Sequence, residues 1–384
     1  MIRLAELRDR KRRHVAGLIS GTSMDGLDVA ICRIEEGKDG LQIELLAFET
    51  VAMPEALRDG LAAEQLNSVA AIARANQALG DYFVAALEQV AAGTLVQLDL
   101  IGSHGQTVYH EHGRTTLQLG EPGPLAARFG CPVVHNFRMN DIAVGGSGAP
   151  LVPHLDQRLF GREGLALLLL NIGGITNFTS LQAAGDVDPR AIGTDCGPGN
   201  MILDQLALIH SRGEARADID GRMAARGRID PLLLERLLDH PFLRAEAPKT
   251  AGREQFGSDY VEALLAEARP ESDAAWHDLM ATVTELTART VADAYRRFVL
   301  PVRKTDALVA AGGGAHNPVL MARLAAHMAP VPVRTSDAYG VPIDAKEAIA
   351  FALLAYDRID GRTANVPSVT GAGRDVLLGQ ITEC

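Results

Sequence analysis

The sequence predicts an α/β protein that consists of two related domains. The chain has 384 residues, of which 47% are hydrophobic, so it can bury more than one core. Runs of β-prone residues alternate with stretches in which apolar residues recur at helical spacing. A strand, glycine turn, strand pattern occurs once in each half, at 15–34 and at 167–181. Such internal repetition indicates a duplicated domain.

The first pattern has two β-prone runs, Val15–Ser20 and Leu27–Ile34, on either side of a glycine turn. The turn is Gly21, Thr22, Ser23, Met24, Asp25 and Gly26. Glycine permits positive φ, and small hydroxyl residues leave backbone N–H groups uncovered, so the turn can hold a phosphate. The nearby carboxylates Asp25 and Asp28 suit a phosphate site only with a cation between them, which indicates a metal–nucleotide ligand. A plain hairpin with a polar turn explains this stretch equally well.

Composition narrows the classes of function. The net charge of −11 and an aromatic content of 4% argue against a nucleic-acid partner, which would require a basic surface or stacking side chains. The longest apolar run, Leu165–Leu170, is far shorter than the ~18 residues that a membrane helix needs. Cysteine spacing matches neither metal nor redox motifs, so we expect reduced thiols in a cytoplasmic protein. The cysteines are Cys32, Cys131, Cys196 and Cys384.

The rest of the N-terminal half continues the sheet and covers it. Residues 41–48 form a third β-prone run, and 55–92 carry apolar residues at the spacing of helices. A buried strand then starts at Leu98, and we expect it to stop at 102–107. Because strand ends in α/β sheets bind ligands, His104 and Gln106 are candidate contacts to a polar ligand. The alternative for His104 is a turn histidine that bonds to the backbone.

Residues 136–153 form a segment rich in glycine and proline that includes Arg138 and Asp141. It is too apolar for a flexible linker, so we expect a fixed loop at a domain junction. Such a loop can orient a small molecule, and Arg138 with Gly148, Ala149 and Pro150 are its candidate contacts.

The second half repeats the opening pattern with Asn171, Gly173 and Gly174 in the turn, and we expect a nucleotide held between the two copies. A third glycine element, Gly312, Gly313 and Gly314, follows a strand and precedes a helix with Asn317 as N-cap and Pro318 at its first position. These glycines let the backbone approach a bulky ligand. Neither the Walker nor the dinucleotide-binding spacing is present.

Two carboxylates are candidates for chemistry. Asp195 ends a predicted strand and precedes a turn and a helix from about Asn200, which suits a general base. Capping of that helix is the alternative for Asp195. Glu347 lies in the first turn of a predicted helix at 344–355, where it either favours the helix dipole or reaches a metal.

Seven motifs together carry a resemblance to a known family. They are Gly21–Asp28, Ser103–Thr107, Gly148–Pro153, Asn171–Asn177, Asp195–Asn200, Pro248–Glu254 and Gly312–Pro318. With these motifs in this order, the chain resembles the anhydro-N-acetylmuramic acid kinase family. The resemblance implies two RNase H-like domains of the actin-like ATPase superfamily around a nucleotide cleft. We expect residues 1–135 with 366–384 in the N-terminal domain and residues 136–365 in the C-terminal domain.

The resemblance also implies an activity. Such an enzyme uses ATP, Mg²⁺ and water to open the 1,6-anhydro bridge of the sugar and to phosphorylate O6, in cytoplasmic peptidoglycan recycling. By motif, residues 21–28, Leu27 included, would hold the nucleotide phosphates and Asp195 would be the base. The triple glycine would approach the adenosine, Asp25 and Glu347 would contact the metal, and the protein would be a homodimer.

The chain departs from the family pattern near the expected sugar site. Met139 and Asn140 follow Arg138 where the family pattern has a further arginine, and Ser147 replaces a glutamine. A missing cation would weaken the hold on the lactyl carboxylate of a muramic acid. The alternative that stays open is a kinase of a neutral 1,6-anhydrosugar such as levoglucosan.

Overall fold

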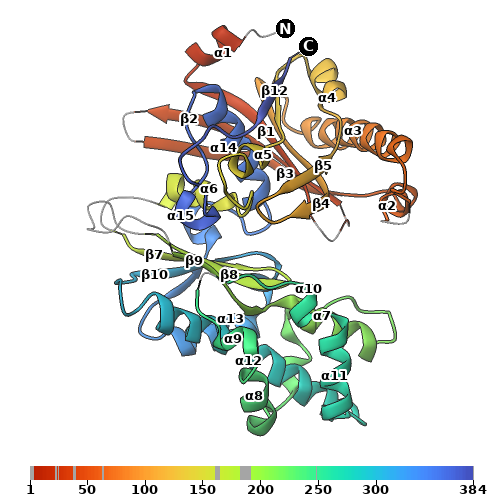
Figure 1. Ribbon diagram of the computed structural model, residues 1–384, viewed down its shortest axis with the longest axis vertical. Helices are drawn as coiled ribbons and strands as arrows, with labels where there is room; N and C mark the ends of the chain where they lie inside the picture. Colours follow the sequence, from red (N-terminus) through yellow and green to blue (C-terminus); the bar gives the residue numbers. More distant parts are fainter. Residues whose placement is uncertain are drawn as a thin grey trace. The chain divides into compact units, whose positions relative to one another are not determined.

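The computed structural model describes residues 4–21, 24, 26–37, 40–62, 65–160, 165–181, 192–247 and 249–383. The chain forms two compact units, one from Met1–Leu159 with Ala345–Cys384 and one from Phe160–Asp344. Each unit is a β-sheet covered by helices (Figure 1). None of the helices in the described ranges is long and apolar enough to cross a membrane.

The N-terminal sheet begins with an antiparallel meander of β1 (Arg12–Ser20), β2 (Gly26–Gly37) and β3 (Gly40–Ala52). On the other side of β1, β4 (Leu100–Glu111) and β6 (Val133–His135) add in parallel. The order across the sheet is β12-β6-β4-β1-β2-β3, and β5 pairs with β4. The remaining strands are β5 (Thr115–Leu119) and β12 (Gln380–Thr382).

The C-terminal sheet repeats this plan. Its antiparallel meander is β7 (Leu167–Ile172), β8 (Ile175–Leu181) and β9 (Ile192–Pro198). Two strands add in parallel beyond β7, namely β10 (Ala307–Ala311) and β11 (Val333–Thr335). The order β11-β10-β7-β8-β9 has the same sense as β6-β4-β1-β2-β3 in the first sheet. The predicted duplication is therefore confirmed, and with it the pair of RNase H-like units.

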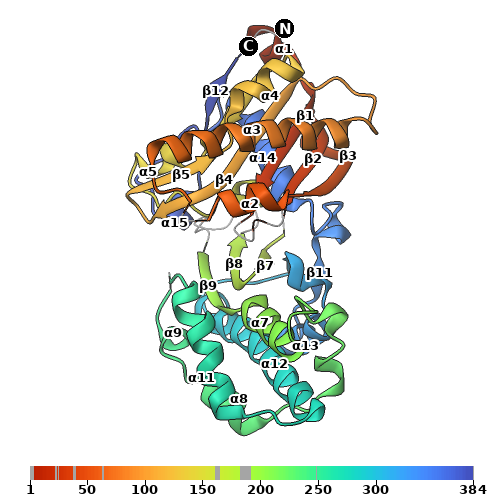
Figure 2. The ribbon, with the colours of Figure 1, turned by 90° about the vertical axis from the view of Figure 1, so that its right-hand side faces the viewer.

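Helices cover both faces of the N-terminal sheet. Figure 2 shows α3 (Val69–Ala91) crossing one face, where it packs on β2 and β3. On the other face α14 (Lys346–Ile359) packs on β1, β2 and β4. It lies so close that a Cβ on Gly17 would come within 1.9 Å of the Ala348 carbonyl oxygen. The other helices of this unit are α1 (Leu4–Asp9), α2 (Glu55–Gly60), α4 (Pro122–Phe129), α5 (Met139–Ile142), α6 (Val152–Phe160) and α15 (Pro367–Thr370).

The long helix α12 (Asp273–Phe298) is central to the C-terminal unit. Its last turns pack in the core below the sheet, and its first turns pack in a second core among helices (Figure 1). The other α-helices are α7 (Asn200–His210), α8 (Pro231–Leu238), α9 (Pro241–Arg244), α10 (Arg253–Phe256), α11 (Ser258–Ala268) and α13 (Pro318–Met328). Four short 3₁₀ segments are η1 (Ile219–Gly221), η2 (Ala224–Arg226), η3 (Gly313–His316) and η4 (Ser336–Tyr339).

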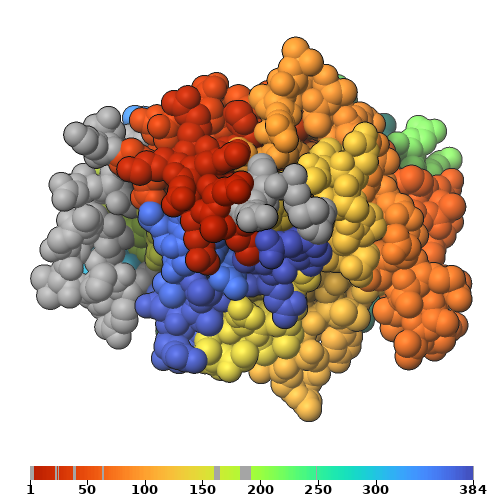
Figure 3. Space-filling model, turned by 90° about the horizontal axis from the view of Figure 1, so that it is seen from above, coloured from red at the N-terminus to blue at the C-terminus, as the bar shows by residue number. Residues whose placement is uncertain are grey.

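The bounds of the compact units differ from the domain bounds expected from the sequence. Residues 136–159 and 345–365 belong to the N-terminal unit, because α14 packs on its sheet. Figure 3 shows C-terminal residues in blue beside N-terminal residues in red on one face of this unit. The predicted loop at 136–153 also contains α5 and the start of α6.

Two predicted strand ends were wrong. β4 does not stop at 102–107 but continues to Glu111, because Gly105 takes a φ of +82° at an irregularity in the pairing and β5 extends the ladder. Asp195 lies inside β9 and not at its end, since β8 pairs with β9 as far as Pro198.

Candidate active site

The predicted phosphate turn joins β1 to β2, but Thr22, Ser23 and Asp25 lie outside the described residues. Met24 has a φ of +55°, and its N–H donates to the Gly21 carbonyl at 3.2 Å. Gly26 is extended strand, and a Cβ there would lie 2.7 Å from the Val51 carbonyl oxygen of β3. The need for glycine at position 26 therefore comes from close packing on β3. Leu27 is fully buried in the core, so only its backbone can face a nucleotide.

The buried side chain of Gln106 supports this turn. Its Oε1 accepts a hydrogen bond from Ser20 Oγ at 2.5 Å, and its Nε2 donates to the carbonyls of Gly21 and Thr107, both at 3.2 Å. The side chain is fully buried. In this geometry Gln106 is a support of the turn, and the predicted contact with a sugar would require it to leave these partners.

His104 and Arg138 form a pair beside the loop that contains Gly148. Arg138 Nε donates to His104 Nε2 at 2.9 Å, and His104 Nδ1 lies 2.9 Å from the Gly105 carbonyl, so the neutral Nδ1–H tautomer satisfies both contacts. Burial, followed by the charge of Arg138, holds the pKa of His104 well below its usual value. His104 thus bonds to the backbone, which was the alternative to a ligand contact in the sequence analysis. It also orients Arg138.

The loop at 145–150 is built around Asp141, which is fully buried. Asp141 Oδ2 accepts from the Gly148 N–H at 2.8 Å, while Oδ1 accepts from Thr370 Oγ1 at 2.8 Å and Asn365 Nδ2 at 3.0 Å. Gly148 has a φ of +77°, and its carbonyl accepts from Arg138 Nη1 at 2.8 Å. The segment Gly148, Ala149 and Pro150 is therefore a fixed loop, tied to the end of the chain.

Glu347 and Asp28 place two carboxylates in the N-terminal unit. Glu347 lies in the first turn of α14, as predicted, and Asp28 lies on β2, where Thr50 Oγ1 donates to it at 2.6 Å. Loss of hydration, followed by the charge of Asp28, raises the pKa of Glu347, and Arg138 and Lys346 oppose the rise. A carboxylate whose pKa is raised by the charge of a second carboxylate suits a cation between the two. In the described ranges no cluster of three metal-ligating side chains is present.

In the C-terminal unit the second glycine turn lies against the triple glycine. Gly312 has a φ of +83°, and a Cβ on it would lie 2.5 Å from Asn171 Oδ1. The carbonyls of Gly173 and Gly174 accept from the N–H groups of Asn200 and Met201 at the start of α7, at 2.8 and 3.1 Å. The turn is therefore fixed to α7.

A cavity of about 140 Å³ lies beside the triple glycine. Gly313 and Gly314 form one wall, and Asn200 and Asp204 of α7 form another. Burial raises the pKa of Asp204 to about 6. Asn317 also lines the cavity, but its Oδ1 accepts from the N–H groups of Val319 and Leu320, so it caps α13 as predicted. The cavity is smaller than typical sites for whole ligands and fits one ring system.

Asp195 is half-buried in β9, and its Oδ2 accepts from the Ala251 N–H at 2.8 Å. Burial raises its pKa to about 6, although the Ala251 hydrogen bond and the charge of Lys249 oppose the rise. The N-cap of α7 is Gly199, so the capping alternative for Asp195 is wrong. A carboxyl group with a pKa near neutrality can accept a proton and release it again.

The structure thus brings the predicted residues together in two groups. The N-terminal unit holds Gly21, Asp28, His104, Gln106, Arg138, Gly148 and Glu347. The C-terminal unit holds Asn171, Gly173, Gly174, Asp195, Gly312, Gly313, Gly314 and Asn317. Sequence reasoning missed the supporting roles of Asp141 and Asn200 and the place of Asp204 in the cavity. The position of Asp204 one helical turn after Asn200 could have indicated the last of these.

Comparison with known proteins identifies relatives over the full length. A family model described as anhydro-N-acetylmuramic acid kinase matches residues 13–384. The chain is 43% identical to the protein of that name from Salinibacter ruber, with 99% of this chain and 98% of the relative covered. It is 39% identical to that of Caldanaerobacter subterraneus subsp. tengcongensis, with both chains fully covered.

Among solved structures, the activator of 2-hydroxyisocaproyl-CoA dehydratase from Clostridium difficile aligns with a TM-score of 0.45 at 13% identity, covering 91% of this chain and 96% of that one. This likeness is too remote to support an argument, whereas the match to the family is direct. The chain belongs to the anhydro-N-acetylmuramic acid kinase family.

Proposed function

We propose that this protein is an ATP-dependent kinase that opens the 1,6-anhydro bridge of anhydro-N-acetylmuramic acid and phosphorylates O6. The product is N-acetylmuramic acid 6-phosphate, an intermediate of peptidoglycan recycling in the cytoplasm. Family membership supports the reaction. The observation that carries the mechanism is Asp195, a half-buried carboxylate with a pKa of about 6 that one backbone N–H orients.

Asp195 is the general base of the proposed reaction. It accepts a proton from water as the water oxygen forms a bond to C1 of the sugar. The C1–O6 bond breaks, and O6 takes the γ-phosphoryl group of ATP while the bond from Pγ to the bridging oxygen of ADP breaks. The carboxylate accepts one proton per turnover and returns it to solvent. A pKa near 6 leaves Asp195 ionised at neutral pH and still basic enough to share the proton.

Each unit contributes to the nucleotide. In the N-terminal unit we assign the backbone N–H groups of the turn at 21–26 to the phosphates. In the C-terminal unit we assign the cavity beside Gly313 and Gly314 to the adenosine, because its size fits a base and its glycines leave room for a flat ring. Asn171, Gly173 and Gly174 support this wall through their contacts with Gly312 and α7.

Asp28 and Glu347 fit a magnesium ion. Both are oxygen ligands of the kind that Mg²⁺ prefers, and the repulsion that raises the pKa of Glu347 would be relieved by a cation. Asp25 is a third candidate ligand, predicted from its place in the phosphate turn. The ion would neutralise charge on the β- and γ-phosphates.

Arg138 is the proposed contact to the lactyl carboxylate. Its Nε donates to His104 and its Nη1 donates to the Gly148 carbonyl, so the guanidinium is held in one orientation. Among the described residues Nη2 has no partner, which leaves it for the substrate. A planar guanidinium suits a carboxylate better than an ammonium does. Arg138 can therefore supply the positive charge for the lactyl carboxylate that Met139 and Asn140 do not supply.

The proposal is tested by comparing sugars under one set of conditions. We expect a higher kcat/KM for anhydro-N-acetylmuramic acid than for anhydro-N-acetylglucosamine or levoglucosan, each measured with ATP and Mg²⁺ by release of ADP. Mass spectrometry of the product in H₂¹⁸O should find one ¹⁸O, introduced at C1. A preference for a sugar without the lactyl group would overturn the substrate, and a product without ¹⁸O would overturn the role of water. Sedimentation at working concentrations tests the expected homodimer.

A further inference from the structure

The orientation of Asp195 depends on a segment that is not part of the sheet. Residues 249–251 lie along β9, the edge strand of the C-terminal sheet. The Asp195 N–H donates to the Lys249 carbonyl at 3.1 Å, and the Ala251 N–H donates to Asp195 Oδ2 at 2.8 Å. The Lys249 N–H donates to Thr194 Oγ1 at 3.2 Å. A shift of this segment would therefore turn the carboxylate.

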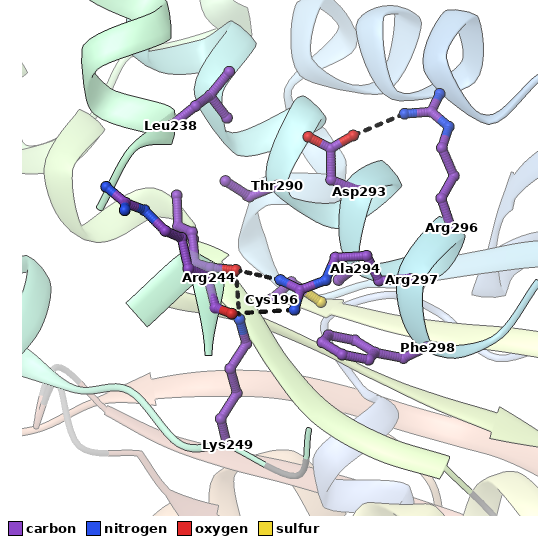
Figure 4. A pocket seen from close by; sticks show the side chains of 11 residues that line it. Cys196, Leu238, Arg244, Lys249, Thr290, Asp293, Ala294, Arg296, Arg297 and Phe298 are labelled. Carbon is purple, nitrogen blue, oxygen red and sulfur yellow. Dashed lines mark hydrogen bonds and ion pairs between the residues drawn. The ribbon is translucent and has the colours of Figure 1, made fainter. Parts of the chain in front are cut away.

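The side chain of Lys249 anchors this segment to α9. Its Nζ donates to the carbonyls of Phe242 and Leu243 at 2.8 and 3.2 Å and lies 4.5 Å from the centre of the Phe242 ring. The last carbonyls of a helix carry partial negative charge, so they favour a cation. Figure 4 shows the Lys249 ammonium close to the Arg297 guanidinium, and both donate to the Leu243 carbonyl. Such charge-assisted bonds are roughly twice as strong as neutral ones.

Lys249 contacts Asp195 through its main chain, and its positive charge lowers the pKa of that carboxyl group. Its side chain lines a cavity of about 310 Å³ that Cys196 also lines. Because successive side chains of a strand point to opposite faces, Asp195 and Cys196 face opposite ways. The charged side chains that line this cavity are Arg244, Lys249, Asp293, Arg296 and Arg297, and the charge of Glu246 also acts on Lys249. Burial raises the pKa of the Cys196 thiol, which stays neutral.

We infer that Lys249 is a positioning residue for Asp195, which holds residues 249–251 so that the Ala251 N–H stays on the carboxylate. This inference rests on the proposed function, in which Asp195 is the base. Removal of the Lys249 ammonium releases the segment from α9, so the carboxylate loses both its hydrogen-bond donor and a nearby positive charge. Both losses favour the protonated carboxyl group.

The test is a pH profile of kcat for Lys249→Met beside the unchanged protein. We expect kcat at its plateau to fall about ten-fold or more, since small misplacements of a reacting group are costly. The acid limb should move to higher pH, while KM for ATP and for the sugar stay within about two-fold. Lys249→Arg, which keeps the cation, should recover most of the plateau and the original limb. Arg296→Met is the matched control, because Arg296 lines the same cavity but bonds to Asp293 and the His327 carbonyl.

The outcomes separate this inference from the proposed function. An unchanged plateau and limb in folded Lys249→Met, with Asp195→Asn inactive, would overturn the positioning role alone. Full activity of Asp195→Asn would instead overturn the base itself. Circular dichroism and calorimetric binding of ATP check that the variants are folded. If Lys249→Met does not fold, Lys249→Gln replaces it in the same measurements. A loss of kcat in Lys249→Arg as large as in Lys249→Met would also contradict the inference.

Discussion

The two units share one strand order but treat their carboxylates differently. In the N-terminal unit Asp156 and Lys346 are both nearly fully buried and form an ion pair at 2.8 Å, and Asp141 accepts from three donors. In the C-terminal unit Asp195 and Asp204 are partly buried, and burial raises the pKa of each to about 6. Carboxylates that are paired with a cation or with several donors hold parts of the chain together, whereas partly buried carboxylates with few partners are available for chemistry.

The largest expected effect is a loss of turnover when the carboxylate of Asp195 in the C-terminal unit is removed. Asp195→Asn keeps the shape of the side chain but cannot accept the proton of water, so kcat should fall by roughly 10²–10⁴-fold while ATP still binds. Turnover by ADP release and ATP binding by calorimetry check this. Glu262→Gln is the control, since it removes an exposed carboxylate of the same unit that lies outside the residues assigned to the site. Near-normal turnover of Asp195→Asn would contradict the mechanism.

The next effect tests the N-terminal side. Lys346→Met leaves Asp156 buried without its cation, so the free energy of unfolding should fall by about 3–5 kcal/mol. Urea unfolding of the variant measures the change. The double variant Lys346→Met with Asp156→Leu removes both charges and should recover most of the loss, because an apolar pair does not need compensation. A double variant as unstable as the single one would show that packing, not charge, sets the effect.

Sequence patterns predicted the features that depend on neighbouring residues. The two hairpins follow from alternating β-prone runs around glycines, and the Asn317 cap with Pro318 follows from helix-start chemistry. Strand β4 was predicted too short because a local breaker rule places an end at Gly105, whereas pairing with β5 continues the ladder.

Distant contacts explain what the sequence could not reveal. Thr370 donates a hydrogen bond to Asp141 across 229 positions, and an ion pair between Lys346 and Asp156 also joins distant parts of the chain. These contacts place 136–159 and 345–365 in the N-terminal unit. Similarly, the link from Lys249 to Asp195 is a main-chain contact of an irregular segment, which no side-chain pattern encodes.

Substrate choice sharpens the comparison in the N-terminal unit, where Arg138 is fixed by His104 and Gly148. Arg138→Met should lower kcat/KM for anhydro-N-acetylmuramic acid about 10–100-fold more than for levoglucosan, because one charge-assisted bond to a carboxylate is worth about 1.5–3 kcal/mol. Arg138→Lys should recover part of the difference, since it restores the charge without the planar donors. Equal losses for both sugars would remove Arg138 from carboxylate recognition.

The smallest expected effect is a change of stability with pH that comes from Asp195. The pKa of Asp195 is raised from an ordinary value of 3.8 to about 6 in the folded protein. The folded state therefore binds the proton more tightly than the unfolded state, so Asp195 contributes stability below about pH 4 that is lost as pH rises through about 6.

Asp195→Asn stays neutral at every pH. Relative to the unchanged protein, it should be more stable by roughly 2 kcal/mol at pH 8 and show little of this gain at pH 4. Urea unfolding at both pH values checks this, with Glu262→Gln as a control at an exposed position of α11. An equal change at pH 4 and pH 8 would mean that the shape of the side chain, and not its ionisation, sets the difference. The folded protein would then not disfavour the ionised form of Asp195.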